Sequence, residues 1–252
     1  MQFIRMTWPQ QQALSRDIPV ILPIAAVEQH GEHMPCGTDT ILTMEIIARM
    51  EKILGDRALI GPTLWLGNSD HHLDFGATIS AAPRTYLDCL HSLVENMVSA
   101  GFRRILLLNG HGGNDVPGKQ AVFELRQKYR NRNDLLLLLS TYWTLGFEPW
   151  LKDPSIQQRE MGHACEWETS MMLAIDPSLV GDYKATKTVE FGNSFQPASR
   201  GWITKDRSAV GHIGSPQFAS AAKGEILLSG FAEAAVGLVE RMIRWDGKSW
   251  EG

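Results

Sequence analysis

The sequence of 252 residues has only three cysteines, no strong charge of either sign and no long apolar run. The cysteines are odd in number and widely spaced, so we expect no disulfide framework and a reducing, cytoplasmic environment. The formal net charge of -4 gives no cationic footprint for nucleic acid or an anionic membrane. No apolar run approaches the length of a transmembrane helix, and the first residues lack the apolar core of a signal peptide. These absences predict a cytoplasmic protein with neither nucleic acid nor a membrane as partner.

The sequence does contain apolar, strand-like segments that alternate with amphipathic, helix-like ones. This alternation is typical of βα units and predicts an α/β fold with a mostly parallel sheet. We find no internal repeat, low-complexity segment or linker, so we expect a single domain over residues 1–252. The expected strands are 19–26, 58–65, 103–108 and 135–139, and the expected helices are 40–54, 83–99, 116–129 and 219–245.

The most informative stretch is the loop that follows the first expected strand, from Val27 to Asp39. In an extended segment Glu28 and His30 point to the same side, because side chains alternate along a strand. Oxygen and imidazole ligands from one loop suit a divalent ion such as Zn, Mn or Fe. The alternative is a polar surface loop in which Asp39 or Thr38 caps the next helix.

A second motif, Asn109-Gly-His-Gly-Gly113, follows the third expected strand directly. The glycines around His111 allow the backbone to approach a ligand closely, and the side chain of Asn109 can fix the turn. The alternative is a structural histidine in a tight turn. A phosphate-binding loop is not expected, because neither GxGxxG nor GxxxxGK[ST] is present.

A third motif runs from His163 to Glu168 at the start of another expected helix. His163 and Glu166 are three residues apart, which on the first turn of a helix places them on one face. Acidic residues at a helix N-terminus are also favoured by the helix dipole, so Glu166 and Glu168 have a purely structural alternative. Cys165 is a poor candidate nucleophile, because neighbours in sequence do not form a nucleophile–base pair easily on a helix.

Taken in order along the chain, these motifs resemble those of the creatininase (creatinine amidohydrolase) family. The resemblance implies a single three-layer α/β/α domain with two divalent metal ions. It rests on Glu28-Gln-His30-Gly with Asp39, Ser69, His72 and Phe75-Gly-Ala-Thr78, Asn109-Gly-His111, Tyr142-Trp143, and His163 with Glu168-Thr-Ser170.

The resemblance also implies a role for each matched residue. Glu28 and His111 correspond to ligands of one ion and His30 to a ligand of the other, while Asp39 bridges both. A bridging hydroxide is then the nucleophile, and His163 corresponds to the catalytic histidine that transfers a proton to the leaving group. Ser69, His72 and Trp143 correspond to residues near the substrate. The family further implies a homo-oligomer, typically a hexamer.

One departure from the family pattern bears on the second ion. Creatininase has Tyr-Glu after its Asn-Gly-His, and that Glu is a metal ligand, whereas this chain has Gly112-Gly113. We therefore hypothesise that Glu166 supplies the missing carboxylate. Glu168 is the fallback, with a role in orienting a ligand or the helix as its alternative.

These residues predict a metal-dependent amidohydrolase that cleaves a C–N amide bond in a small polar substrate. Creatinine itself is not expected, because the Tyr-Glu pair is missing. One alternative is a C–C bond hydrolase of a cyclic sugar ketone on the same metal centre. Another is a non-catalytic metal-binding α/β protein, although structural zinc sites usually close with four ligands and often include Cys. A nucleotide-binding protein is the third, and it lacks a phosphate loop.

Overall fold

The computed structural model describes residues 1–192 and 195–250, in which strands and helices alternate as expected. All strand pairs in the sheet are parallel, and the strand order is β2-β1-β3-β4. The strands are β1 (Val20–Ile24), β2 (Leu59–Ile60), β3 (Arg104–Asn109) and β4 (Leu136–Thr141). The α-helices are α1 (Trp8–Gln12), α2 (Thr38–Leu54), α3 (Pro83–Ser99), α4 (Asp115–Lys128), α5 (Glu166–Ile175) and α6 (Ala221–Arg244).

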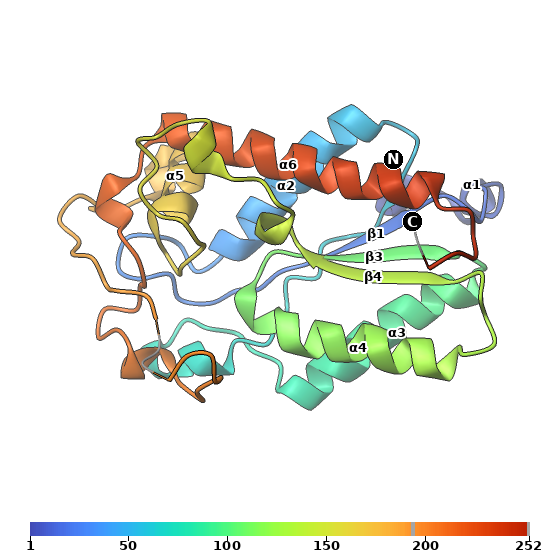
Figure 1. Ribbon diagram of the computed structural model, residues 1–252, viewed down its shortest axis with the longest axis horizontal. Coiled ribbons are helices and arrows are strands. Elements are labelled where there is room, and N and C mark those ends of the chain that lie inside the picture. Colours follow the sequence, from blue (N-terminus) through green and yellow to red (C-terminus); the bar gives the residue numbers. More distant parts are fainter. Residues whose placement is uncertain (193–194, 251–252) are drawn as a thin grey trace.

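Helices cover both faces of the sheet, which confirms the predicted three-layer α/β/α arrangement. Figure 1 shows α2, α5 and α6 above the strands and α3 and α4 below them. Successive residues of β3 point to opposite faces. Leu106 and Leu108 therefore pack in the core under α2, α5 and α6, whereas Ile105 and Leu107 pack in the core over α3 and α4. Both faces are apolar because both are buried, as is usual for parallel sheets.

The order of the strands reverses between β1 and β3. From β1 the chain passes through α2 to β2 on one side, and then through α3 on the opposite face to β3 on the other side. Ile24 and Asn109, the last residues of β1 and β3, pair directly. In open α/β sheets, ligands bind beyond the strand ends at such a reversal. The fold thus brings the first two motifs of the sequence together.

The second strand is much shorter than the segment 58–65 that the sequence predicted. Only Leu59–Ile60 pairs continuously with β1, and Leu64 rejoins it through a single bridge, with its N–H donating to Pro23 across 2.9 Å. The reason is Pro62, which has no N–H to donate to a neighbouring strand.

Two helix starts differ from expectation in ways that affect the site. Helix α2 begins at Thr38 after Gly37, and neither Thr38 nor Asp39 caps it. Helix α5 begins at Glu166, so His163 lies before the helix rather than on its first turn. In the described part of the chain, no helix is long and apolar enough to cross a bilayer.

Candidate metal centre

Four polar side chains meet beyond the ends of β1 and β3, and all are almost completely buried. Glu28, His30 and Asp39 come from the loop after β1 and the first turn of α2, and His111 follows β3 directly. Their exposed fractions are 1%, 0%, 4% and 3%. Burying ionisable groups is costly unless they are paired or bind a metal ion. The sequence predicted each of these residues as a ligand, and the structure brings them together.

Asp39 lies between two imidazoles. Its Oδ1 is 3.2 Å from Nε2 of His30, and its Oδ2 is 2.8 Å from Nδ1 of His111. One carboxylate thus presents an oxygen to each histidine, which is the arrangement that a bridging ligand requires. The alternative role of Asp39 as a helix cap is excluded, because its side chain makes no capping hydrogen bond.

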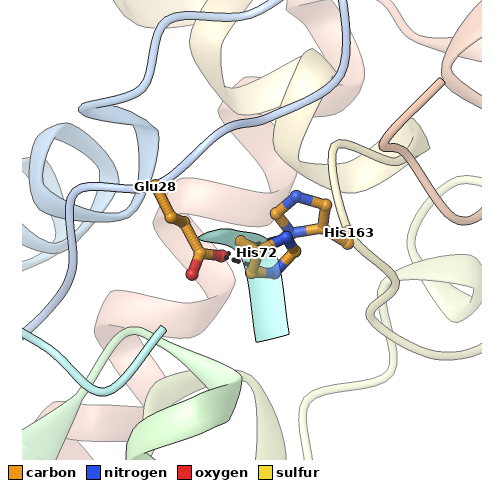
Figure 2. A group of neighbouring side chains, drawn as sticks. All are labelled: Glu28, His72 and His163. Carbon is orange, nitrogen blue, oxygen red and sulfur yellow. Dashed lines mark ion pairs between the residues drawn. The ribbon is translucent and has the colours of Figure 1, made fainter. Parts of the chain in front are cut away.

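Glu28 faces three imidazoles, of which His111 is shared with Asp39. Its Oε1 is 3.2 Å from Nε2 of His72 and 3.4 Å from Nδ1 of His163, as Figure 2 shows. Its Oε2 is 3.4 Å from Nε2 of His111. The ligand atoms of Glu28, His30 and Asp39 all lie within 4.8 Å of one another, so a single ion can contact all three.

Several atoms in this cluster are buried without a hydrogen-bond partner among the described residues. They are Oε2 of Glu28, Nε2 of His30 and Oδ2 of Asp39. The other ring nitrogen of His30, Nδ1, donates to the carbonyl of Glu28 across 3.1 Å, so Nε2 is the nitrogen that would bind a metal ion after releasing its proton. Orphaned buried acceptors that converge on one point fit a divalent cation, and this donor set of carboxylates and imidazoles suits Zn, Mn or Fe.

The electrostatics of the cluster agree with that fit. Burial raises the pKa of Glu28 to about 7. Burial opposes protonation of His111, but Glu28 and Asp39 raise its pKa to about 9. Burial would likewise raise the pKa of Asp39, yet His30 and His111 hold it below its usual range. Where no ion is bound, protons on these imidazoles balance the buried carboxylates, and divalent cations would take the place of those protons.

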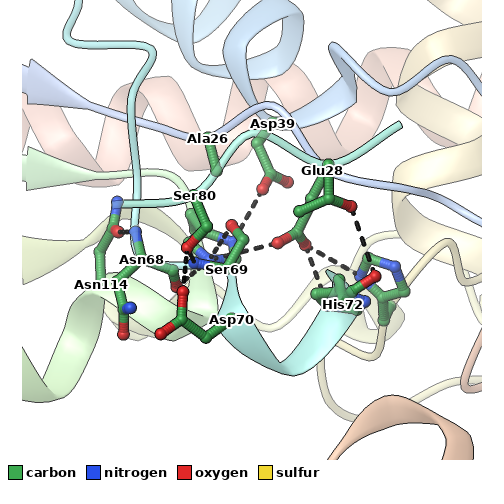
Figure 3. A network of polar contacts seen from close by, with 12 residues as sticks. Ala26, Glu28, Asp39, Asn68, Ser69, Asp70, His72, Ser80 and Asn114 are labelled. Atoms are coloured by element: carbon green, nitrogen blue, oxygen red, sulfur yellow. Dashed lines mark hydrogen bonds and ion pairs between the residues drawn. The ribbon is translucent and has the colours of Figure 1, made fainter. Parts of the chain in front are cut away.

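The loop before η2 (Asp70–Phe75) fixes the orientation of the His111 ring, and Figure 3 shows the hydrogen-bond network that holds this loop in place. The side chain of Asn114 accepts from the N–H of Asn68 across 2.9 Å and donates to the carbonyl of Ala25 across 3.0 Å. The carbonyl of Asn68 then accepts from Nε2 of His111 across 3.0 Å. Because Nε2 makes this contact, Nδ1 is the ring nitrogen of His111 that faces Asp39.

The expected role of Asn109 in the turn is confirmed. Its Oδ1 accepts from the N–H of His111 across 3.0 Å, and its Nδ2 donates to the carbonyl of His111 across 2.7 Å. Nδ2 also donates to Oγ1 of Thr141 across 3.0 Å. The side chain of Asn109 therefore ties the end of β3 to β4 and fixes the backbone that carries His111.

His163 is placed as a neutral base at the edge of the cluster. Its Nε2 donates to the backbone carbonyl of Gln29 across 2.7 Å, which leaves Nδ1 unprotonated and facing Glu28. Burial, with the positive charge on His30, keeps the pKa of His163 well below its usual range. A side chain of this kind can accept a proton on Nδ1 and release it again.

The prediction for Glu166 is contradicted by the structure. Its Oε1 is 2.6 Å from Nζ of Lys223, and its Oε2 accepts from the backbone N–H groups of Gln157 and Gln158 across 3.0 and 2.8 Å. The prediction assumed that His163 and Glu166 share the first turn of a helix. Because α5 starts only at Glu166, that assumption fails.

Glu168, the fallback, takes the position that was expected for Glu166. Its Oε1 is 3.7 Å from Nε2 of His30, and its ligand atom groups with those of His30 and His163. On a helix, Glu166 and Glu168 point about 200° apart, so only one of them can face the cluster. That residue is Glu168.

The Gly112-Gly113 pair leaves no room for a side chain at its second position. A Cβ atom at Gly113 would lie 2.5 Å from Nε2 of His111 and closer still to the carbonyl oxygen of Asn68. At Gly112 nothing lies within 4 Å of such an atom. A carboxylate at position 113 therefore does not fit this backbone, and Glu168 reaches the cluster from a different element.

Sequence reasoning gave no role to Gln29, which is 6% exposed and lies between the two ligands Glu28 and His30. Its Oε1 accepts from the N–H of Gly31 across 2.8 Å, and its Nε2 donates to the carbonyl of Gly211 across 2.9 Å. These two contacts fix which way the amide points. No sequence signal indicated the orientation of the Gln29 amide, because Gly211 is far away along the chain.

The three residues that were predicted to bind substrate divide into two groups. His72 and Trp143 line a cavity of about 930 Å³ that opens above the cluster. Ser69 does not line it. Ser69 is fully buried, and its Oγ lies 3.2 Å from Nε2 of His111. A hydrogen bond from the Ser69 side chain to Glu28 also lowers the pKa of Glu28. Ser69 therefore contacts the proposed metal ligands and is not in a position to contact a substrate in the cavity.

The sequence matches the profile of the creatininase family, described as creatinine amidohydrolase, over residues 4–239. It is 28% identical to creatinine amidohydrolase of Pseudomonas putida over 243 residues, covering 88% of this chain and 90% of that protein. It is 30% identical to a mycofactocin precursor peptide peptidase of Mycolicibacterium smegmatis over 236 residues, covering 90% of this chain and 85% of that protein.

A shorter match, 30% identical over 112 residues, is to 3-dehydro-scyllo-inosose hydrolase of Thermotoga maritima and covers 44% of this chain and 35% of that protein. The crystal structure of creatinine amidohydrolase superposes with a TM-score of 0.82 at 25% identity, covering 97% of this chain and 98% of that one. Similar creatininase structures are described as a Zn-Zn type and as a manganese form, each with a TM-score of 0.81.

Proposed function

The chain belongs to the creatininase family, and from that premise we propose that it is a metal-dependent hydrolase that cleaves a C–N amide bond in a small polar substrate. The observation that carries the proposal is the position of Asp39, whose two oxygens face His30 and His111 at 3.2 and 2.8 Å. Few structural roles require a buried carboxylate between two buried imidazoles. A centre of two ions that share one ligand does require it.

In this proposal each ion has its own ligands in addition to Asp39. Glu28 and His111 would hold one ion, and His30 and Glu168 would hold the other. The relatives that are described as zinc and manganese forms support a divalent metal here. Bound ions of this kind supply Lewis acidity, which polarises a carbonyl group and lowers the pKa of water.

The chain's own residues supply proton transfer and orientation. His163 accepts a proton on Nδ1 and returns it to the leaving nitrogen, while the Gln29 carbonyl holds the proton on Nε2. His72 presents an N–H group beside Glu28, where it can donate to a substrate oxygen. Trp143 forms part of the cavity wall that excludes water from the reacting group.

Reconstitution of the purified protein tests the proposal. Protein stripped of metal by a chelator and then loaded with Zn²⁺ or Mn²⁺ is assayed against formamides, lactams and cyclic ureas. We expect hydrolysis only after loading, and loss of hydrolysis with His163→Ala at unchanged metal content. Full loading without hydrolysis of any of these compounds would count against the proposal.

A second candidate is hydrolysis of a C–C bond in a cyclic sugar ketone on the same centre. It is supported by the partial match to 3-dehydro-scyllo-inosose hydrolase. The two functions separate in one assay, because a formamide or lactam releases an amine whereas a cyclic ketone releases only a carboxylic acid.

We also propose a homo-oligomer, for which the family expectation is a hexamer. Two large apolar side chains of α4, Val116 and Phe123, are 75% and 62% exposed, and such side chains often mark a contact between subunits. Light scattering coupled to size-exclusion chromatography measures the assembly directly. A monomer at micromolar concentration would contradict this proposal.

A further inference from the structure

The cavity above the cluster carries positive charge around its wall. Its floor is acidic and includes Glu28 and Asp39, two residues of the network in Figure 3. Three arginines, Arg84, Arg200 and Arg207, also line the cavity. In the described part of the chain its only acidic lining residues are Glu28, Asp39 and Glu168, all of which belong to the proposed metal centre.

These arginines have no carboxylate partner within 4.0 Å among the described residues. Arg49 shows the contrasting case, since its guanidinium lies 2.5 Å from Glu225 and 2.8 Å from Glu45. An arginine beside a cavity that has no acidic partner is available to bind an anionic ligand. Its planar guanidinium suits a carboxylate or phosphate group in particular.

Arg207 is held in place before any ligand binds. Its guanidinium lies 5.0 Å from the centre of the Trp202 ring, and Trp202 in turn meets the ring of His71 edge-on at 5.2 Å. Partial burial lowers the pKa of Arg207. Arginine side chains nevertheless stay charged in proteins. Stacking on a tryptophan fixes the guanidinium, so that less entropy is lost when it binds an anion.

The floor of the cavity does not neutralise these arginines once metal is bound. Two divalent ions carry more positive charge than the three carboxylates of the floor carry negative charge. This step rests on the proposed function. The loaded cavity then carries a net positive charge, which attracts an anion and disfavours a cationic substrate.

The rest of the cavity wall is aromatic and apolar. Trp143 and Phe191 line it together with Trp202, the residue that supports Arg207. Aromatic walls of this kind bind the flat or apolar part of a ligand, while a few charged groups fix its orientation.

We propose that the substrate carries an anionic group, a carboxylate or a phosphate, beside a flat apolar portion, and that Arg84, Arg200 and Arg207 bind this anionic group. The arginines thus select the substrate without taking part in bond cleavage. A substrate that has the same amide bond but lacks the anionic group binds more weakly at an unchanged metal centre.

Calorimetric titration with matched metal-binding probes tests this proposal. The zinc-loaded protein is titrated with 4-carboxybenzohydroxamate and with its neutral isostere, 4-carbamoylbenzohydroxamate. We expect the carboxylate to bind about tenfold more tightly than the isostere, as befits a charge-assisted hydrogen bond. A third probe, 4-phosphonobenzohydroxamate, distinguishes the two anions, because tighter binding than the carboxylate identifies a phosphate group as the ligand.

Arginine variants connect that preference to the cavity wall. The variants are Arg200→Gln, Arg207→Gln and the triple variant that also carries Arg84→Gln. Each should reduce the ratio of the affinities for the carboxylate probe and the neutral probe to less than about twofold, while the affinity for the neutral probe stays unchanged. Arg5→Gln is the matched control, because Arg5 is exposed at the end of η1 (Phe3–Arg5) and does not line the cavity. Equal affinities in the wild-type protein, or a preference that survives the triple substitution, would overturn the proposal.

The same titration separates this proposal from the proposed function. If the neutral probe fails to bind the loaded protein, the two-ion centre is contradicted. The substrate proposal then depends on the carboxylated probe alone, and it stands only if that probe binds and the arginine substitutions abolish its binding. Absence of binding by both probes overturns the substrate proposal as well.

Discussion

The side-chain amide of Gln29 donates a hydrogen bond to Nδ1 of His72 across 2.7 Å. The direction of this bond follows from the other contacts of the amide, because its oxygen is held by the N–H of Gly31 and its nitrogen by the carbonyl of Gly211. Nδ1 of His72 is therefore an acceptor, and the ring proton is on Nε2, which lies 3.2 Å from Glu28. Gln29, which is neither a proposed metal ligand nor a residue that lines the cavity, thus decides what His72 offers to the site.

Replacement of Gln29 tests this relationship directly. In Gln29→Leu the amide donor to Nδ1 is lost, and the remaining partner, the Thr204 hydroxyl at 3.0 Å, can either donate or accept. We therefore expect His72 to populate both neutral tautomers and kcat to fall about tenfold or more, with a smaller effect on KM. Nitrogen-15 NMR of the imidazole reports the tautomer without any substrate. The wild-type spectrum should show protonation on Nε2 alone.

Ser208→Ala is the matched control for Gln29→Leu. The hydroxyl of Ser208 accepts from the N–H of Gly211 across 3.0 Å, so its removal loosens the same loop but leaves the amide of Gln29 in place. An identical tautomer mixture in the wild-type protein and Gln29→Leu would show that Gln29 does not set the proton position.

The two acidic residues at the start of α5 should respond differently to the same substitution. Glu166→Gln weakens a buried ion pair with Lys223, so we expect it to lower the free energy of unfolding by about 3 kcal/mol and to leave the metal content unchanged. Glu168→Gln should cost about 1 kcal/mol, because it weakens a capping contact to Cys165 and a longer contact with His30, but it should remove one ion per chain.

Urea denaturation and elemental analysis of both variants measure these quantities together. Each variant serves as the control for the other, since the two substitutions change the same atoms on the same first turn of α5. Loss of an ion from Glu166→Gln but not from Glu168→Gln would reverse the assignment made from the geometry.

Introducing a carboxylate at position 113 should damage the centre rather than complete it. In Gly113→Glu the new Cβ atom collides with the carbonyl of Asn68 and with His111, so His111 must move and the metal affinity should fall at least tenfold. Gly112→Glu is the control, because the space around Gly112 is open and metal binding there should stay within about twofold. Isothermal titration with Zn²⁺ compares them, and tighter binding by Gly113→Glu would contradict the steric argument.

The affinity for metal should rise with pH across the neutral range. In the absence of an ion, Glu28 and His111 have pKa values of about 7 and about 9, so both are largely protonated below pH 7. Each proton must leave when an ion binds, and the affinity therefore rises by about tenfold per pH unit for each proton released. Below pH 6 the same competition weakens binding.

Chelator competition at pH 6, 7 and 8 measures this dependence, and calorimetry in buffers of different ionisation enthalpy counts the protons. In Glu28→Gln the contribution near pH 7 should disappear, and that of His111 should move to lower pH because Glu28 no longer raises its pKa. Equal affinities at pH 6 and pH 8 in the wild-type protein would exclude the proposed proton competition.

Much of the fold and of the cluster was predictable because it depends on local patterns. The alternation of apolar strands and amphipathic helices specifies the layers, and the ligand-type residues that follow the strands Val20–Ile24 and Arg104–Asn109 must meet where parallel strands end. Glu28, His30 and His111 became candidates in this way, and the family resemblance implied their roles as ligands. Asp39 was ambiguous in the sequence, because a first-turn aspartate serves equally well as a helix cap.

The errors arose where the outcome depends on helix phase or on distant partners. One shift in the start of α5 exchanged the roles of Glu166 and Glu168, and the pairing of Glu166 with Lys223 links residues 57 positions apart. Gln29 was overlooked because its partners lie as far away as Gly211. The short strand β2 was overestimated because the effect of Pro62 on pairing was not considered.

The position of bound metal is the most direct test of the two-ion centre. Crystals of the zinc-loaded protein, measured above and below the zinc absorption edge, locate every ion by anomalous scattering. We expect two peaks that share Asp39, one in contact with Glu28 and His111 and the other with His30 and Glu168. A single peak, or two peaks without Asp39 between them, would contradict the proposed centre.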